Sequence, residues 1–148
     1  MRRSSFSLIF ISIIFGSMLI QANAQAASKD FADKKVVLQI SDNDPFKQTL
    51  VLNVANNLIK HYGPDQVDIE IVAFGPGLRL LFAENANKPR IDSLVGSGVR
   101  FSACSNTIEN MSKKLGHELA LSAHARRVSA GVVRIIDLVK KGFILIKP

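Results

Sequence analysis

The sequence predicts an α/β fold with a mainly parallel sheet of about five strands. Short apolar runs alternate with amphipathic segments along most of the chain, and turn residues separate them. Strands that alternate with helices favour a parallel sheet with right-handed crossovers and helices on both faces. No repeat, low-complexity tract or linker divides residues 35–148, so we expect a single domain there.

The first 24 residues have the features of a cleavable signal peptide. Arg2 and Arg3 precede an apolar run over residues 8–20, and residues 22–24 form an A-x-A cleavage signal. The run is short for a membrane span, which needs about 20 residues, so we expect no stable membrane insertion after cleavage. The cleavage signal also disfavours an uncleaved anchor. Export is therefore expected, and the short leader favours a bacterial periplasm.

Composition argues against nucleic-acid binding. Cleavage after residue 24 would leave 124 of the 148 residues, enough for one buried core, and would lower the formal net charge from +7 to +5. The remaining basic residues are scattered, and one tyrosine with no tryptophan provides no stacking platform for single-stranded nucleic acid. Residues 25–34 are polar and predict a flexible amino-terminal arm.

Two strands and one long helix are predicted in the amino-terminal half. Residues 35–40 are apolar and β-branched, which indicates a buried strand. A helix is expected over residues 45–61, because Asp44 is a suitable N-cap and Pro45 suits the first helical position. Residues 67–74 alternate and then become wholly apolar, which predicts a second strand.

A Gly-Pro-Gly segment follows the second strand. Gly75, Pro76 and Gly77 predict a tight turn whose glycines let the chain pass close to a neighbour beside Cys104. A phosphate-binding loop is disfavoured, because Pro76 has no N–H and no Lys-Ser or Lys-Thr follows. Short helices are expected over residues 78–84 and 90–96.

The carboxyl-terminal half is predicted to continue the alternation of strands and helices. Asn106 and Glu109 form a capping-box pattern, which predicts a helix that starts there. Strands are expected over residues 99–103 and 143–146, with a less distinct strand ending near residue 128, and helices over residues 106–115 and 132–141.

Cys104 is the only cysteine and comes directly after the third predicted strand. Functional groups of open α/β sheets gather at the carboxyl ends of strands. A thiol before a helix amino terminus meets unpaired N–H groups and the positive end of the helix dipole, and both favour the thiolate. Ser105, Asn106 and Thr107 are the candidate stabilising residues. The residues alone leave two readings open, a reactive thiol and a buried structural cysteine.

No metal or cofactor site is expected. His61, His117 and His124 lack the spacing of metal ligands, and a single cysteine is available to join them. The chain also lacks a G-x-S-x-G nucleophile elbow and an evident pair of catalytic carboxylates.

Three segments resemble the DsrE/DsrF-like family, which includes sulfur-relay proteins of the DsrE and TusD type. They are VAFGPGLRLL (72–81), IDSLVGSGVRFSACSNT (91–107) and VSAGVVRIIDLVKKGFILIKP (128–148). The pattern G-V-x-F-x-A-C-x-N-T over residues 98–107 is the most specific part. The resemblance implies a flavodoxin-like three-layer α/β/α sandwich, a persulfide-carrying cysteine at Cys104, and homo-oligomers such as trimers or hexamers.

Two functions from different classes follow. The leading hypothesis is a periplasmic sulfur carrier, in which Cys104 accepts a sulfane sulfur and passes it to a thiol-bearing partner. The relay proteins that the chain resembles are cytoplasmic, so their donors and acceptors are not carried over. The alternative is a non-enzymatic small-ligand-binding or homo-oligomeric assembly module of the same fold, which uses the crevice near residues 75–77 and Cys104.

Overall fold

The computed structural model describes residues 27–148. The predicted signal peptide at residues 1–24 lies outside the described residues, as do the first two residues of the predicted arm. Within residues 27–148, no helix is long and apolar enough to cross a membrane.

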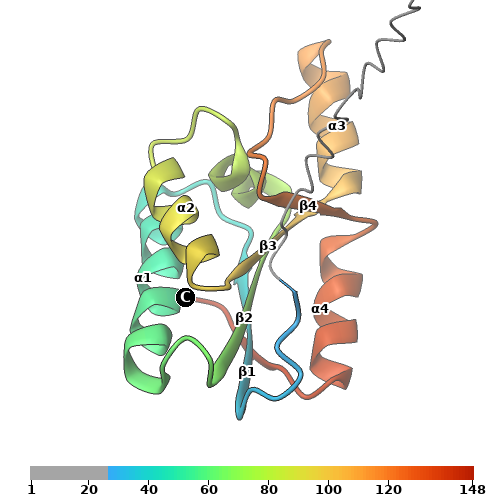
Figure 1. Ribbon diagram of the computed structural model, residues 1–148. Helices are drawn as coiled ribbons and strands as arrows, with labels where there is room; N and C mark the ends of the chain where they lie inside the picture. Colours follow the sequence, from blue (N-terminus) through green and yellow to red (C-terminus); the bar gives the residue numbers. More distant parts are fainter. Residues whose placement is uncertain (1–26) are drawn as a thin grey trace, which may run out of the picture.

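Strands and helices alternate along the described chain, and the expected strands are all present (Figure 1). The expected long helices are present as well, with ends that differ from the predicted ones by no more than two residues. The elements in chain order are β1 (Lys34–Ile40), α1 (Pro45–Tyr62), β2 (Val67–Ala73), the 3-10 helix η1 (Gly75–Leu81), α2 (Lys88–Gly96), β3 (Arg100–Cys104), α3 (Ser105–Leu115), β4 (Ala125–Val128), α4 (Gly131–Lys140) and β5 (Ile144–Ile146).

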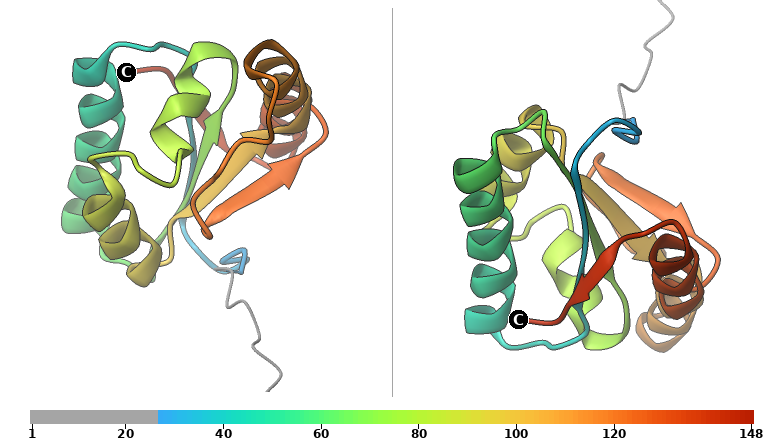
Figure 2. Two further views of the ribbon diagram at one scale, coloured as in Figure 1. Left: turned by 90° about the horizontal axis from the view of Figure 1, so that it is seen from above. Right: turned by 90° about the horizontal axis from the view of Figure 1, so that it is seen from below.

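The five strands form one parallel sheet in the order β4-β3-β2-β1-β5. The chain advances strand by strand from β1 to β4 and then returns across the sheet to β5. Crossovers of a single hand place α1 and α2, from the advance, and α4, from the return, on opposite faces, whereas α3 stands beyond the strand ends and is stacked on α4. Figure 2 shows α1 and α2 on one side of the sheet and α4 on the other. The fold is therefore a flavodoxin-like three-layer α/β/α sandwich, as predicted.

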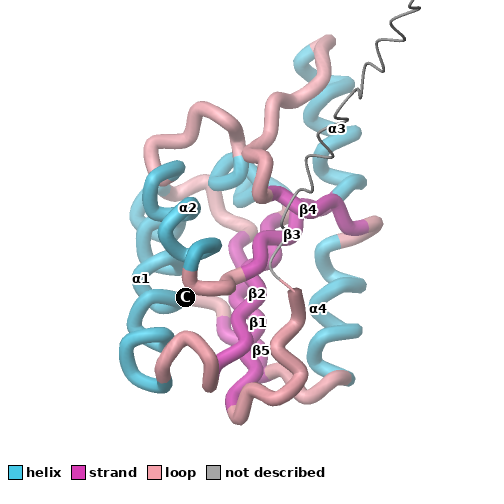
Figure 3. Tube along the Cα trace, in the orientation of Figure 1, coloured by secondary structure: helices cyan, strands magenta, loops and turns pink. Residues whose placement is uncertain are grey.

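The two faces of the sheet carry cores of different size. The larger core lies under α1, η1 and α2, and the first turn of α3 adds Ile108 to it. The smaller core lies under α4 and consists of Val37, Val72, Ile135, Leu138 and Phe143, with Phe74 packed against it. Figure 3 shows the sheet between these two helical layers. The α4 face of the sheet therefore buries few apolar side chains, and polar side chains occupy the rest of it.

Helix α1 begins and ends as its sequence predicts. The carboxylate of Asp44 accepts a hydrogen bond from the backbone N–H of Phe46 at 2.8 Å, and Pro45 occupies the first helical position. Gly63 follows with a φ of 88°, a left-handed conformation that glycine adopts without strain. The N-cap prediction is confirmed.

Two helix starts differ from the sequence-based expectation. The 3-10 helix η1 begins at Gly75, so the Gly-Pro-Gly segment is helical from its first residue rather than a turn before a helix at residue 78. Helix α3 begins at Ser105 with Cys104 as its N-cap, and the predicted capping box of Asn106 and Glu109 is wrong. Strand β3 runs directly into α3, which leaves no room for a separate capping residue.

Residues 27–33, part of the predicted flexible arm, contact the amino-terminal ends of the strands. The backbone N–H of Lys29 donates to the Asp68 carboxylate at 3.2 Å, and the carbonyl of Ala27 accepts from Arg100 at 3.2 Å. Ala32 is buried, whereas Phe31 is fully exposed. These residues therefore pack against the strand ends before β1 starts at Lys34.

Candidate functional site

The candidate site lies at the carboxyl-terminal edge of the sheet, where β2, β3 and β4 end. Helices α3 and α4 start there and run in opposite directions, so their amino termini face each other (Figure 1). Seen from above, the two helices overlap, which shows that they are stacked nearly end to end (Figure 2). The positive ends of two helix dipoles thus meet at the end of β3, which is the position of Cys104.

Cys104 is a free cysteine with 5% of its surface exposed. Its burial alone would raise the pKa of the thiol. The hydroxyl of Thr107 and the backbone N–H groups of Gly131, Thr107 and Asn106 outweigh burial and lower that pKa. These groups come from the first turns of both α3 and α4. The surroundings therefore favour the thiolate, the nucleophilic form of cysteine.

Hydrogen bonds join the loops around the thiol. The backbone N–H of Gly75 donates to Thr107 Oγ1 at 3.0 Å, which ties the start of η1 to α3. The backbone N–H of Asn106 donates to the carbonyl of Ser129 at 3.4 Å, which ties α3 to the connection before α4. Thr107 therefore both faces the sulfur and holds the neighbouring loop.

At Gly77 the chain passes close to a neighbour, as expected of the Gly-Pro-Gly segment, but that neighbour is the end of β1 and not the segment that carries Cys104. A Cβ atom on Gly77 would lie 2.4 Å from the carbonyl oxygen of Ile40, at the end of β1. Gly75 adopts a φ of 51° and lies beside the first turn of α3 through its bond to Thr107. Glycine is thus required at residue 77 by sterics and favoured at residue 75 by conformation.

A shallow pocket of about 230 Å³ lies beside the thiol. Its lining residues are Gly75, Pro76, Thr107, Asn110, Met111 and Lys114. Three predicted site residues therefore line one cavity, whereas Gly77, Cys104, Ser105 and Asn106 do not. Thr107 is the residue that connects this cavity with the sulfur.

A buried charged cluster on the α4 face escaped the sequence analysis. It consists of Asp68 and Glu70 on β2, Arg100 on β3 and Arg134 on α4. Both carboxylates are fully buried and Arg100 is 6% exposed. Arg100 bridges them, with an ion pair to Asp68 and a hydrogen bond from Nε to Glu70 Oε2 at 3.1 Å. Two carboxylates and two guanidinium groups balance each other in charge.

Glu70 is the centre of this cluster. Arg134 donates Nε to Oε1 and Nη2 to Oε2, each at 2.7 Å, and the hydroxyl of Ser102 donates to Oε1 at 2.7 Å. Burial by itself would raise the pKa of Glu70, but the hydrogen bonds from Arg134 and Ser102 and the charges of both arginines lower it to about 2. The same pairing raises the pKa of Arg134. Glu70 is therefore a carboxylate at neutral pH.

The alternation of strands places this cluster in line with the thiol. Side chains at every second residue of a strand share a face, so Arg100, Ser102 and Cys104 lie in one row on β3. The residues between them, Phe101 and Ala103, belong to the core on the α1 face. The sequence signal was two acidic residues at alternate positions of one strand and an arginine at the start of the next, in a sheet that is covered on both faces.

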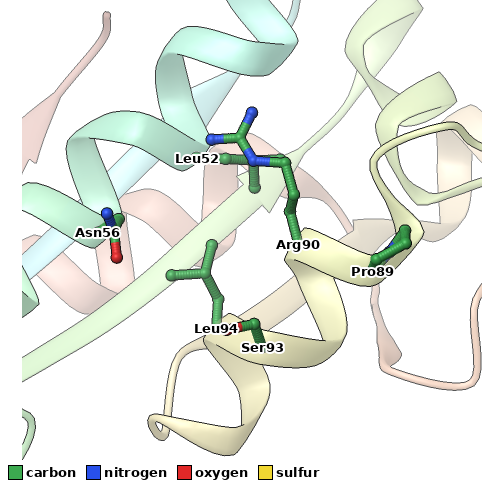
Figure 4. A pocket seen from close by; sticks show the side chains of 6 residues that line it. All are labelled: Leu52, Asn56, Pro89, Arg90, Ser93 and Leu94. Carbon is green, nitrogen blue, oxygen red and sulfur yellow. The ribbon is translucent and has the colours of Figure 1, made fainter.

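A second cavity is remote from the thiol. It has a volume of about 280 Å³ and lies between α1 and α2, as Figure 4 shows. Its lining residues are Leu52, Asn56, Pro89, Arg90, Ser93 and Leu94, none of them a predicted site residue. Over residues 27–148, no group of three or more His, Cys, Asp or Glu side chains is arranged to hold a metal ion.

The fold is similar to that of a protein of unknown function, MTH1491 from Methanobacterium thermoautotrophicum, with a TM-score of 0.69. The two sequences are 31% identical, and the match covers 78% of this chain and 100% of that one. No protein-family model and no curated protein matches the chain. The likeness supports the fold and carries no function with it. The chain belongs to the same family as MTH1491.

Proposed function

We propose that this protein is an exported sulfur carrier of the DsrE/DsrF-like type that holds sulfur as a persulfide on Cys104. The observation that carries the proposal is the position of the thiol between the amino termini of α3 and α4, where three backbone N–H groups and one hydroxyl lower its pKa. The same donors favour a persulfide anion, which has the same charge. The resemblance over residues 98–107 supports the same assignment.

The reaction is a transfer of sulfane sulfur between thiols. The Cys104 thiolate attacks the terminal sulfur of a donor persulfide, forms a new S–S bond and releases the donor as a thiolate, which takes up a proton from solvent. A thiolate of the acceptor then attacks the terminal sulfur on Cys104 and releases the Cys104 thiolate. Each step exchanges one S–S bond for another, so no external oxidant or reductant is needed. Partner proteins with a reactive thiol fit both roles.

Intact-mass measurement tests the proposal. Purified protein is incubated with a small-molecule persulfide, desalted and weighed, and then weighed again after reduction. We expect a gain of one sulfur atom that reduction removes, and no gain in the Cys104→Ser variant. A thiol that reacts with iodoacetamide but never gains sulfur would contradict the carrier assignment and favour the binding module.

Export is part of the proposal. The predicted leader at residues 1–24 should be removed, so that protein expressed with its native amino terminus is found in the periplasm and begins at Gln25. Recovery of the full-length chain from the cytosol would contradict export and favour a cytoplasmic relay.

Assembly into a homo-oligomer is the second proposal, and the outer face of α4 favours it. Large apolar side chains on α4 and on the edge strand β5 are exposed, with exposed fractions of 44% to 60%. They are Val132, Val133, Ile136, Val139, Ile144 and Leu145. A second copy of this chain would cover this face and the unpaired edge of β5 together.

Light scattering coupled to gel filtration tests the assembly. We expect the wild-type protein to be a trimer or hexamer, and Ile136→Asp to shift it to the monomer, because a charge on α4 cannot be buried in an apolar interface. Phe31→Asp, at a fully exposed residue of the amino-terminal arm outside α4 and β5, is the control and should leave the mass unchanged. A monomeric wild-type protein would contradict the proposal.

A further inference from the structure

Glu70 connects the strand that carries the thiol to the helix that faces it. Its carboxylate accepts from Ser102 on β3 at 2.7 Å and from two nitrogens of Arg134 on α4, also at 2.7 Å. Ser102 precedes Cys104 by two residues on the same face of β3, and Arg134 lies in the first turn of α4, three residues after Gly131. The carboxylate thus connects the two elements that flank the sulfur.

Few other contacts fix the start of α4, among them the 3.4 Å hydrogen bond from the backbone N–H of Asn106 to the carbonyl of Ser129. The helix has no side-chain cap at Ala130, and the residues that it buries are Gly131, Ile135 and Leu138. Gly131 packs so closely on the ring of Phe74 that a Cβ atom would lie 2.9 Å from it. That contact limits how near α4 comes to the sheet but does not hold it there. The bidentate pair between Arg134 and Glu70 holds α4 against the sheet, because its two parallel hydrogen bonds fix the orientation of the arginine as well as its distance from the carboxylate.

We propose that Glu70 and Arg134 are positioning residues that hold the amino terminus of α4, and with it the N–H of Gly131, against the sulfur of Cys104. This inference rests on the proposed function, since it gives the pair a part in preparing the thiolate. Neither residue touches the reacting sulfur.

The titration of the thiol is the readout. The rate of labelling by iodoacetamide is measured against pH for the wild-type protein and for Arg134→Lys, which keeps the positive charge and loses the bidentate fork. The midpoint of the profile reports the pKa of the thiol, and its plateau at high pH reports access of the reagent. We expect the midpoint to move to higher pH, with a thiolate fraction at neutral pH about fivefold lower.

A second variant separates geometry from simple charge. Glu70→Gln removes a negative charge, and charge alone would stabilise the thiolate and move the midpoint to lower pH. If the loss of positioning dominates, the midpoint of labelling moves to higher pH instead. The charged groups that face Glu70 are Arg100 from β3 and Arg134 from α4, and Asp137 lies next to Arg134 on the same helix.

Asp68→Asn is the matched control. Asp68 is a fully buried carboxylate on the same strand and the same face, and its hydrogen bonds go to Arg100 and the amino-terminal arm rather than to α4. This variant is expected to lose stability while its labelling midpoint stays at the wild-type value.

The inference is overturned if folded Arg134→Lys titrates like the wild type, or if Glu70→Gln moves the midpoint to lower pH. Should neither variant fold, Ser102→Ala decides, because it removes one neutral donor to Glu70 and should raise the midpoint by a smaller amount. An unchanged midpoint in that variant would overturn the inference as well. These results are independent of sulfur loading. A shifted midpoint in a protein that never gains sulfur would support the positioning role and contradict the carrier function. Sulfur loading with unshifted midpoints would support the carrier function and contradict the positioning role.

Discussion

Replacement of Glu70 by glutamine is expected to destabilise the protein strongly at neutral pH. The side chain is fully buried and its carboxylate accepts four hydrogen bonds, two of them from Arg134. Removing one partner of a buried ion pair leaves the opposite charges without compensation, which costs about 3–5 kcal/mol. Glutamine keeps the volume, so a cavity contributes little to the loss.

The pH dependence of this loss follows from the lowered pKa of Glu70. A fall from 4.5 to about 2 corresponds to about 3 kcal/mol of stability above pH 4.5, because only the folded state keeps the carboxylate ionised as the pH decreases. That contribution is lost as the pH falls from about 4.5 toward 2, and by pH 3 about 2 kcal/mol of it should be gone. The Glu70→Gln variant has no carboxylate at this position, so this contribution to its stability is absent at every pH.

Urea unfolding at pH 7 and at pH 3 measures both effects. We expect the wild type and Glu70→Gln to differ by about 3–5 kcal/mol at pH 7, and by about 2 kcal/mol less at pH 3. Glu118→Gln is the control, because its side chain is 81% exposed and its pair with Arg127 is worth about 0–1 kcal/mol. An equal difference between the wild type and Glu70→Gln at both pH values would refute the assignment of Glu70 as a buried, ionised carboxylate.

Three further changes test the local geometry. Gly77→Ala places a Cβ atom 2.4 Å from the last carbonyl of β1, so urea unfolding should show a loss of about 1–3 kcal/mol, whereas Gly96→Ala, with no atom within 4 Å, should change stability by less than about 1 kcal/mol. Thr107→Val removes the hydroxyl that faces the sulfur, so the pKa of Cys104, measured by labelling against pH, should rise. Asp44→Ala removes the cap of α1 and should lower the free energy of unfolding by about 1 kcal/mol.

The parts of the fold that local chemistry specifies were predictable from the sequence. The strand at β1 follows from its apolar run, and α1 follows from Asp44, Pro45 and Gly63, each of which acts on its own neighbours. The placement of Cys104 at a strand end before a helix was predictable for the same reason. Its exact role as N-cap was not, since the choice among residues 104–106 depends on where β3 stops.

The buried charged cluster shows what a sequence pattern alone leaves open. Asp68 and Glu70 alternate with apolar residues, which is also the pattern of a strand with one solvated face. Arg100 pairs with Asp68 across 32 residues of the chain, and Arg134 pairs with Glu70 across 64. A short stretch of sequence therefore never contains both partners of a pair. Only the register of β2 with β3 and the return of α4 bring them together.

The amino-terminal arm bears on the order in which the domain is completed. Ala27 meets Arg100 across 73 residues of chain, and Lys29 meets Asp68 across 39, so neither contact can form until the strand that carries its partner, β3 or β2, is in place. Closing such long loops is costly in chain entropy, and the contact offsets that cost only after the strands have come together. The first residues of the domain to leave the ribosome are therefore among the last to be fixed. A chain that began after Lys29 would lack the backbone groups that hydrogen-bond to Asp68 and Arg100. The minimal folding unit consequently extends ahead of its first strand.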